Sequence, residues 1–301
     1  MPSQSKSGRR HQVSKPYTPY LMALPYILLL LVFPISAYNI AVQSLGMVPG
    51  VVEELDFDAY MRVFTSENTL EGIGLSLYIA VASTIPSVVL GTLAAWCIAT
   101  LKQETVFGAI VAKLPQQIPH AVACIVMVNM FLPTGMLVRI CMALGIQGAA
   151  DVFNEVLYFP NSIGVIIEYI WKEGPYVTFM MLPSMSGMSS RFGEAACNLG
   201  ASSLRSFVDV MLPNCMQGIR TCAIIVFVVT LGSYETPMLL GHSTVRALPV
   251  LAYSEYTFSN FAVHRPISMA LNMVTIVIAL VFSLAYYWYG VKQEQKMKGG
   301  F

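Results

Sequence analysis

The sequence is poor in charged residues. Of its 301 residues only 11% are Asp, Glu, Lys or Arg, whereas 56% are hydrophobic. Soluble domains carry roughly a quarter charged residues, so this composition excludes an ordinary soluble domain and indicates a membrane protein. The formal net charge of +1 is uninformative, because the charges are segregated along the chain. We expect membrane lipids and no nucleic acid among the partners.

The sequence also lacks the motifs of common catalytic and metal sites. It contains no phosphate loop of the form G-x-x-x-x-G-K-[ST], no HExxH and no GxSxG. None of the six cysteines forms a CxxC pair, and the four histidines show no metal-ligand spacing. We therefore expect no catalytic residue, no metal site and no cofactor bound by this chain.

Long apolar segments are present instead. A helical membrane span needs about 20 predominantly apolar residues. Six segments qualify, at residues 20–43, 72–99, 114–133, 161–182, 215–240 and 266–291. The sequence therefore predicts an all-α polytopic membrane protein with six transmembrane helices. Its membrane domain covers 20–291, between an N-terminal tail at 1–19 and a C-terminal tail at 292–301.

The positive residues predict the orientation of these spans. With the N-terminus inside, 12 Lys and Arg residues fall on the cytoplasmic side and four, Arg62, Arg139, Arg246 and Arg265, fall in outer loops. This asymmetry predicts an N-in/C-in topology. The loop at 183–214, between the fourth and fifth spans, then faces the cytoplasm.

That loop contains the short segment EAACNLGASSLRSFVDVMLPN, residues 194–214, which is too polar to span a bilayer. Residues 194–199 can form about two helical turns, and Gly200 is suited to a left-handed helix stop. Ser202 or Ser203 can then cap a second helix. The segment therefore predicts a helix, a glycine bend and a second helix.

The second helix is predicted to be amphipathic and to end at Pro213. Its apolar residues have the spacing i, i+3, i+4 and i+7, which places them on one face; they are Leu204, Phe207, Val208 and Met211. Patterning alone allows two interpretations. The segment is either an interfacial helix under the bundle or a docking element for a soluble partner.

The residues Glu194-Ala195-Ala196, Gly200 and Leu212-Pro213 resemble the EAA signature of binding-protein-dependent ABC importer permeases. The resemblance implies the type I (MetI-like) permease fold, with a coupling helix that inserts into a cleft of an ATPase subunit. Asn198 departs from the Asp found in many relatives. Carried over to this chain, the expected ATPase-coupling residues are Glu194, Ala195, Ala196, Gly200, Ala201 and Leu204.

The runs LDFDAYMRVF, NLGAS and ETPMLLG look like the polyamine-transport subfamily of these permeases. The resemblance implies an inner-membrane permease with lipid around it, a related second permease, two ATPase subunits that hold ATP and Mg, and an extracytoplasmic solute-binding protein. A homodimeric permease core is the open alternative. Polyamine is the first expected solute, with iron, aminophosphonate or sugar as alternatives. A stand-alone secondary transporter or channel is the rival class.

Ionisable residues inside a bilayer are costly, so each needs a partner, water or a function. Glu168 and Lys172 are spaced i, i+4, which predicts an ion pair, whereas His120 is interpreted as a packing residue. Glu235 follows Gly232, where the helix is expected to kink or break. We hypothesise a path for a cationic solute, whose ammonium groups would favour aromatic faces. Its predicted lining is Glu168, Trp171, Tyr234 and Glu235; the alternative is that Glu235 is simply hydrated at the membrane surface.

Overall fold

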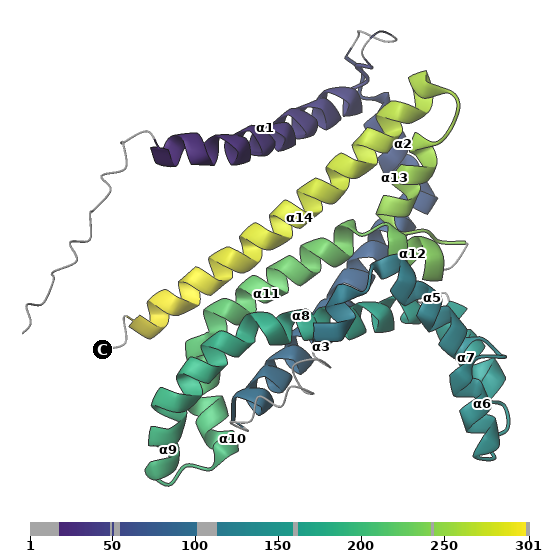
Figure 1. The fold of residues 1–301 in the computed structure, drawn as a ribbon. Coiled ribbons are helices and arrows are strands. Elements are labelled where there is room, and N and C mark those ends of the chain that lie inside the picture. Colours follow the sequence, from purple (N-terminus) through teal and green to yellow (C-terminus); the bar gives the residue numbers. More distant parts are fainter. Residues whose placement is uncertain are drawn as a thin grey trace, which may run out of the picture.

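The computed structural model describes residues 18–48, 50, 55–100, 113–158, 162–241 and 244–298. Most of the predicted N-terminal tail and the end of the predicted C-terminal tail lie outside these residues. The longer helices are α1 (Thr18–Ser44), α3 (Glu67–Thr100), α5 (His120–Phe131), α8 (Ile163–Met188), α11 (Leu212–Gly232) and α14 (Phe261–Lys298). Shorter helices are α2 (Asp58–Thr65), α6 (Met136–Ala143), α7 (Ala149–Tyr158), α9 (Glu194–Asn198), α10 (Ser203–Ser206), α12 (Glu235–Leu240) and α13 (Leu248–Tyr256). The regular elements described are thus helical, as predicted (Figure 1).

Five helical segments of the described chain are long and apolar enough to cross a membrane: Tyr20–Ser44, Glu67–Thr100, His120–Ala143, Ser203–Gly232 and Phe261–Gln293. The predicted fourth span coincides with α8, a helix of 26 residues that is not among the five. Glu168, Lys172 and Glu173 lie within α8, and all three are buried in the protein. The count of six spans and the orientation therefore remain predictions.

Two predicted spans differ from the helices observed. The chain leaves α11 at Gly232, and Ser233 is extended with φ −74° and ψ 132° before α12 begins, which confirms the predicted break. The predicted third span, 114–133, is interrupted at Ile118 and Pro119, and α5 begins only at His120. At the other end of the chain, α14 continues without a break into the predicted C-terminal tail.

The centre of the bundle is the crossing of α3 and α8. A side chain at Gly91 would place its Cβ 2.6 Å from the carbonyl oxygen of Gly174, so the two backbones approach closely there. Thr178 Oγ1 donates a 3.1 Å hydrogen bond across this crossing to the Gly91 carbonyl. Small residues and interhelical hydrogen bonds are the usual means of packing helices in lipid. This crossing fixes α8 in the middle of the protein.

The predicted outer ends of α3 and α14 hold α13 in place. The Leu248 N–H donates a 2.7 Å hydrogen bond to Ser76 Oγ, and Ser268 Oγ donates a 2.6 Å hydrogen bond to the Ala252 carbonyl. Figure 1 shows α2, α12 and α13 gathered at one end of the bundle and α9 and α10 at the opposite end, while α1 lies alongside α14. The two candidate sites thus lie at different levels of the molecule.

Candidate coupling element and solute path

Residues 194–206 form the predicted helix, glycine bend and helix. After α9, Gly200 adopts a left-handed φ of 95°, and the Ala201 N–H donates to the Ala196 carbonyl at 3.0 Å, a bond that closes the helix end. Ser202 caps α10, because its Oγ accepts a 3.3 Å hydrogen bond from the Arg205 N–H. The local structure predicted from spacing is therefore confirmed, with Ser202 as the capping residue.

The predicted apolar face of the second helix is wrong in part. Phe207 and Met211 are only 4% and 2% exposed, but Leu204 and Val208 are 61% and 48% exposed. Over this stretch the helix is wound as the π-helical turn η2 (Phe207–Met211), and only its first and last residues are buried. Pro213 does not end this helix either. It lies in the first turn of α11, where a proline is tolerated.

The six predicted coupling residues lie at the exposed end of this element. Glu194, Ala195, Gly200 and Leu204 are exposed, while Ala196 and Ala201 are half-buried. The neighbouring Leu199 is 90% exposed, although it was not among the predicted coupling residues. An element anchored by Phe207 and Met211 therefore presents small and apolar side chains outward, as a docking surface requires. The coupling role of these residues remains a prediction.

Glu168 lies in a buried polar cluster that joins α5, α8 and α12. Its side chain is 0% exposed; Oε1 is 3.1 Å from His120 Nδ1, and Oε2 accepts a 3.3 Å hydrogen bond from Thr236 Oγ1. Lys172 Nζ donates instead to the Ile118 carbonyl at 2.6 Å. The predicted Glu168–Lys172 ion pair is therefore wrong. The helix is interrupted at Ile118 and Pro119, directly before His120, so the Ile118 carbonyl can accept a hydrogen bond from Lys172.

His120, which the sequence analysis interprets as a packing residue, is also the hydrogen-bonding partner of Glu168. Its Nε2 is also 4.0 Å from Oε1 of Glu173, so one imidazole lies between two carboxyl groups of α8. Glu168 and Glu173 are spaced i, i+5. Neither local spacing nor apolar patterning indicates that α5 supplies their partner. The position directly after Pro119, at the start of a helix, is the one available signal.

The other predicted path residues divide into two environments. Glu235 is exposed in the first turn of α12, beside the Thr236 that contacts Glu168. Trp171 packs against the apolar cluster around Tyr169, and the ring of Tyr234 lies 4.5 Å from that of Tyr253. The structure thus places α12 beside Glu168, whose side chain is fully buried. The involvement of these residues in a solute path remains a prediction.

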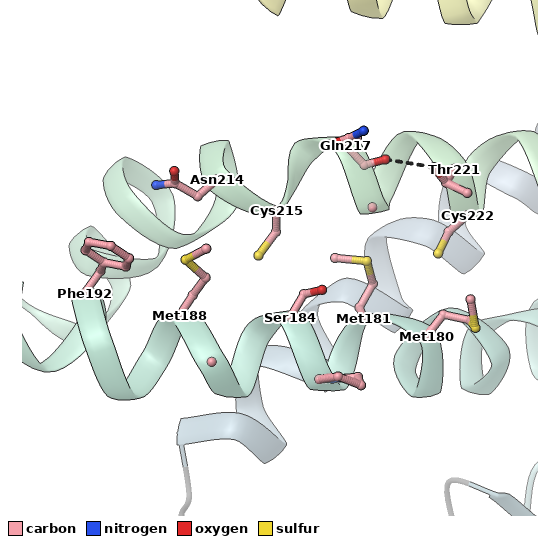
Figure 2. Close-up of a pocket in the computed structure, with 13 residues that line it drawn as sticks. Met180, Met181, Ser184, Met188, Phe192, Asn214, Cys215, Gln217, Thr221 and Cys222 are labelled. Carbon is pink, nitrogen blue, oxygen red and sulfur yellow. Dashed lines mark hydrogen bonds between the residues drawn. The ribbon is translucent and has the colours of Figure 1, made fainter. Parts of the chain in front are cut away.

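A cavity with a volume of about 620 Å³ lies between α8 and α11. Figure 2 shows Met181, Ser184 and Met188 projecting from α8 toward Cys215 and Cys222 on α11. Asn214, Gln217 and Thr221 also line it, and the described lining residues are uncharged. The spacing of Asn214, Gln217 and Thr221 on one helix face was the signal for this cavity.

The chain thus forms a helical bundle with an exposed EAA element. Comparison with known proteins gives its family. Residues 66–298 match the family described as "Binding-protein-dependent transport system inner membrane component". The chain belongs to this family of ABC importer permeases. It is therefore a multi-pass inner-membrane protein, and its family is one of permease subunits and not of enzymes.

The relatives differ in how much of the chain they match. The sulfate transport system permease protein CysT of Synechocystis sp. is 23% identical over 275 residues, which cover 90% of this chain and 89% of the relative. The spermidine/putrescine permease protein PotB of Haemophilus influenzae is 26% identical, but only over 40% of this chain and 43% of the relative. The polyamine subfamily predicted from the sequence is therefore not supported.

Solved structures show the same fold. A bacterial ABC transporter involved in import of the acidic polysaccharide alginate gives a TM-score of 0.75 at 20% identity and covers 92% of this chain and 96% of that chain. An alginate transporter in complex with an alginate pentasaccharide-bound periplasmic protein gives a TM-score of 0.71 at 20% identity and covers 90% and 92%. The type I permease fold implied by the EAA signature is thus confirmed.

Proposed function

We propose that this chain forms half of the solute pathway of an ABC importer and couples it to an ATPase through α9. The support is the exposed end of the element, where the side chains of Glu194 and Ala195 are exposed. A small residue such as Ala195 lets a partner approach the helix backbone, and the Glu194 carboxylate can accept a charge-assisted hydrogen bond. Because this sequence has no phosphate loop, ATP and Mg belong on the partner.

The assembly we propose contains two ATPase subunits, a second, related permease and an extracytoplasmic solute-binding protein. The family name itself refers to transport that depends on a binding protein. An alginate transporter of the same fold was solved in complex with a periplasmic protein that binds an alginate pentasaccharide. The rival interpretation, a secondary transporter that acts alone, predicts none of these partners.

For the solute we propose an oxygen-rich molecule, either a small oxyanion or a sugar, in place of a polyamine. One observation carries this proposal: the cavity between α8 and α11 offers the neutral hydrogen-bonding groups of Ser184, Gln217 and Thr221. Hydroxyl and amide groups both donate and accept, and thus suit oxygen-rich solutes. A polyamine would instead need carboxylates or aromatic faces at its ammonium groups. The relatives named for sulfate and alginate import agree with this choice.

Two measurements test the proposal. Thermal shift of the cognate binding protein should respond to one of sulfate, molybdate, an aminophosphonate or maltose, and not to spermidine or putrescine. Uptake of that ligand should then fall to background in Ser184→Trp, which fills the cavity. Ser36→Trp is the matched control, because Ser36 is exposed on α1. A shift with spermidine or putrescine alone, or normal uptake in Ser184→Trp, contradicts the proposal.

A further inference from the structure

The coupling element consists of α9, the bend at Gly200 and α10. Through the turn η2 that follows it, this element contacts α3 by a pair of aromatic rings. Trp96, in the last turns of α3, stacks on Phe207 with ring centroids 4.5 Å apart and an interplanar angle of 25°. Phe207 is buried in the cluster that contains Ala95 of α3 and Met181 of α8. Along the chain, the coupling element is joined covalently only to α8 and α11. A movement of the element can therefore reach α3 only through non-covalent contacts such as this stack.

The element is closed on itself at the same point. Ser206 Oγ, next to Phe207, donates a 3.2 Å hydrogen bond to the carbonyl of Gly193, which directly precedes α9. Gly193 is buried, and a Cβ there would lie 3.4 Å from Met211 Sδ. The start of α9 is thus tied to the residue beside the aromatic stack. A displacement of α9 therefore moves Phe207 as well.

Both connections of the element to the spans are π-helical. The turn η1 (Ser189–Gly193) joins α8 to α9, and η2 (Phe207–Met211) joins α10 to α11. Single π-helical turns inside helices interrupt the regular hydrogen bonding and occur often at functional sites. The element can therefore change its angle at two such turns, and the Trp96–Phe207 stack is what fixes that angle relative to α3.

Space for such a change is present beside Trp96. A pocket of about 330 Å³ separates the end of α3 from α9, with Trp96 and Thr100 on one wall and Glu194, Cys197 and Asn198 on the other. The indole Nε1 of Trp96 is buried and makes no hydrogen bond with any residue that the structure describes. The stack is thus an apolar contact at the edge of a space into which α9 can move.

We propose that Trp96 is a positioning residue that transmits the movement of the coupling element to α3 and the helices packed on it. This inference rests on the proposed function, since it takes the ATPase to dock on α9. Stacking, rather than apolar bulk alone, is the feature required, because offset stacking fixes the mutual orientation of two rings. The effect reaches the cavity between α8 and α11 because Phe207, Met181 and Cys222 belong to one buried cluster.

The test uses the native complex, isolated through an affinity tag on this chain and placed in lipid nanodiscs. The probe is Mg·ATP with orthovanadate, and the readout is the alkylation rate of Cys222 by N-ethylmaleimide, followed by peptide mass spectrometry. Cys222 lines the larger cavity on α11, remote in sequence from the docking helix. We expect the nucleotide to change this rate by about fivefold in the wild type and in Trp96→Phe, the scale of one aromatic pair.

Phe207→Leu keeps apolar bulk but removes the stack, so the nucleotide effect on Cys222 should disappear while the ATPase stays bound. Phe282→Leu is the matched control, because it removes another stacked pair, in which the ring centroids of Phe282 and Phe227 are 3.6 Å apart. This variant should keep the nucleotide effect on Cys222. A nucleotide effect that survives in both Phe207→Leu and Trp96→Ala overturns the inference alone, and so does loss of the ATPase from Phe207→Leu. Absence of an ATPase from the wild-type complex overturns the proposed function.

Discussion

His120 and Glu168 meet inside the bundle, with Nδ1 3.1 Å from Oε1, although 48 residues separate them in the sequence. The same carboxyl group accepts a hydrogen bond from Thr236, so one buried side chain joins α5, α8 and α12. A buried carboxylate is tolerated when its oxygens are hydrogen-bonded. Glu168 therefore acts as a structural link between three helices, in the N-terminal half of α8.

Removal of His120 should destabilise the protein. His120→Ala leaves a buried oxygen of Glu168 without its partner, which costs about 1 to 3 kcal/mol. The thermal unfolding midpoint of the purified protein in detergent should fall by several degrees. Asn129→Ala is the matched control on α5, because Asn129 is exposed and bonds only within its own helix. Equal midpoints for the two variants would show that the His120–Glu168 contact adds nothing.

Glu235 should affect transport and not stability. Its side chain is exposed in the first turn of α12, so Glu235→Gln should leave the unfolding midpoint unchanged. If Glu235 borders the path, removal of its charge should speed uptake of an anionic solute by a few fold, or slow uptake of a cation, as expected from a charge interaction of about 1 kcal/mol. Asp58→Asn, at an exposed site paired with Arg62, is the control. Uptake rates that match this control would remove Glu235 from the path.

The parts of the structure that the sequence could predict are those set by local spacing. The bend at Gly200 needs only one residue that tolerates positive φ, and the break after Gly232 follows from a short Gly-Ser stretch before Pro237. The EAA signature placed the coupling element because its residues are consecutive in the chain. Each of these predictions depends on a few neighbouring residues and not on the packing of distant helices.

The features that were missed depend on contacts between helices. The partner of Glu168 is His120 and not Lys172, because α5 brings the imidazole to α8. Lys172 instead donates its hydrogen bond to the carbonyl of Ile118, where the helix is interrupted. The predicted apolar face of the second helix is split, because only Phe207 and Met211 are buried. Phe207 stacks on Trp96 of α3, a contact with a distant helix that a 3.6-residue period cannot indicate.

The crossing of α3 and α8 gives a prediction about a single methyl group. In Gly91→Ala the new Cβ would lie 2.6 Å from both the Gly174 carbonyl oxygen and Val177 Cβ, so the helices must separate. Overpacking of this kind costs about 1 to 3 kcal/mol. Gly74→Ala, on the same helix with nothing within 4 Å of its Cβ, should be neutral or stabilising. Thermal unfolding checks both, and a Gly91→Ala protein as stable as Gly74→Ala contradicts the packing described.

Gly200 should be required for its backbone conformation. Its φ is 95° and nothing lies within 4 Å of a Cβ placed there, so a substitution acts through backbone strain of about 1 kcal/mol or more. Gly200→Val should weaken retention of the ATPase during purification, and Gly200→Asn should weaken it less, since Asn tolerates this region. Gly145→Val is the control: Gly145 has φ 84° and the same open surroundings, but precedes α7. Equal retention in both Val variants would exclude a role for the bend.

The central claim is that α9 docks an ATP-hydrolysing subunit, and co-isolation tests it most directly. The complex is purified from native membranes through a tag on this chain, and its subunits are identified by mass spectrometry. We expect a subunit with a G-x-x-x-x-G-K-[ST] phosphate loop in the wild type and its loss in Ala196→Arg, which places a bulky charge on the half-buried face of α9. A wild-type complex without such a subunit, or an Ala196→Arg complex that retains it in full, would contradict the claim.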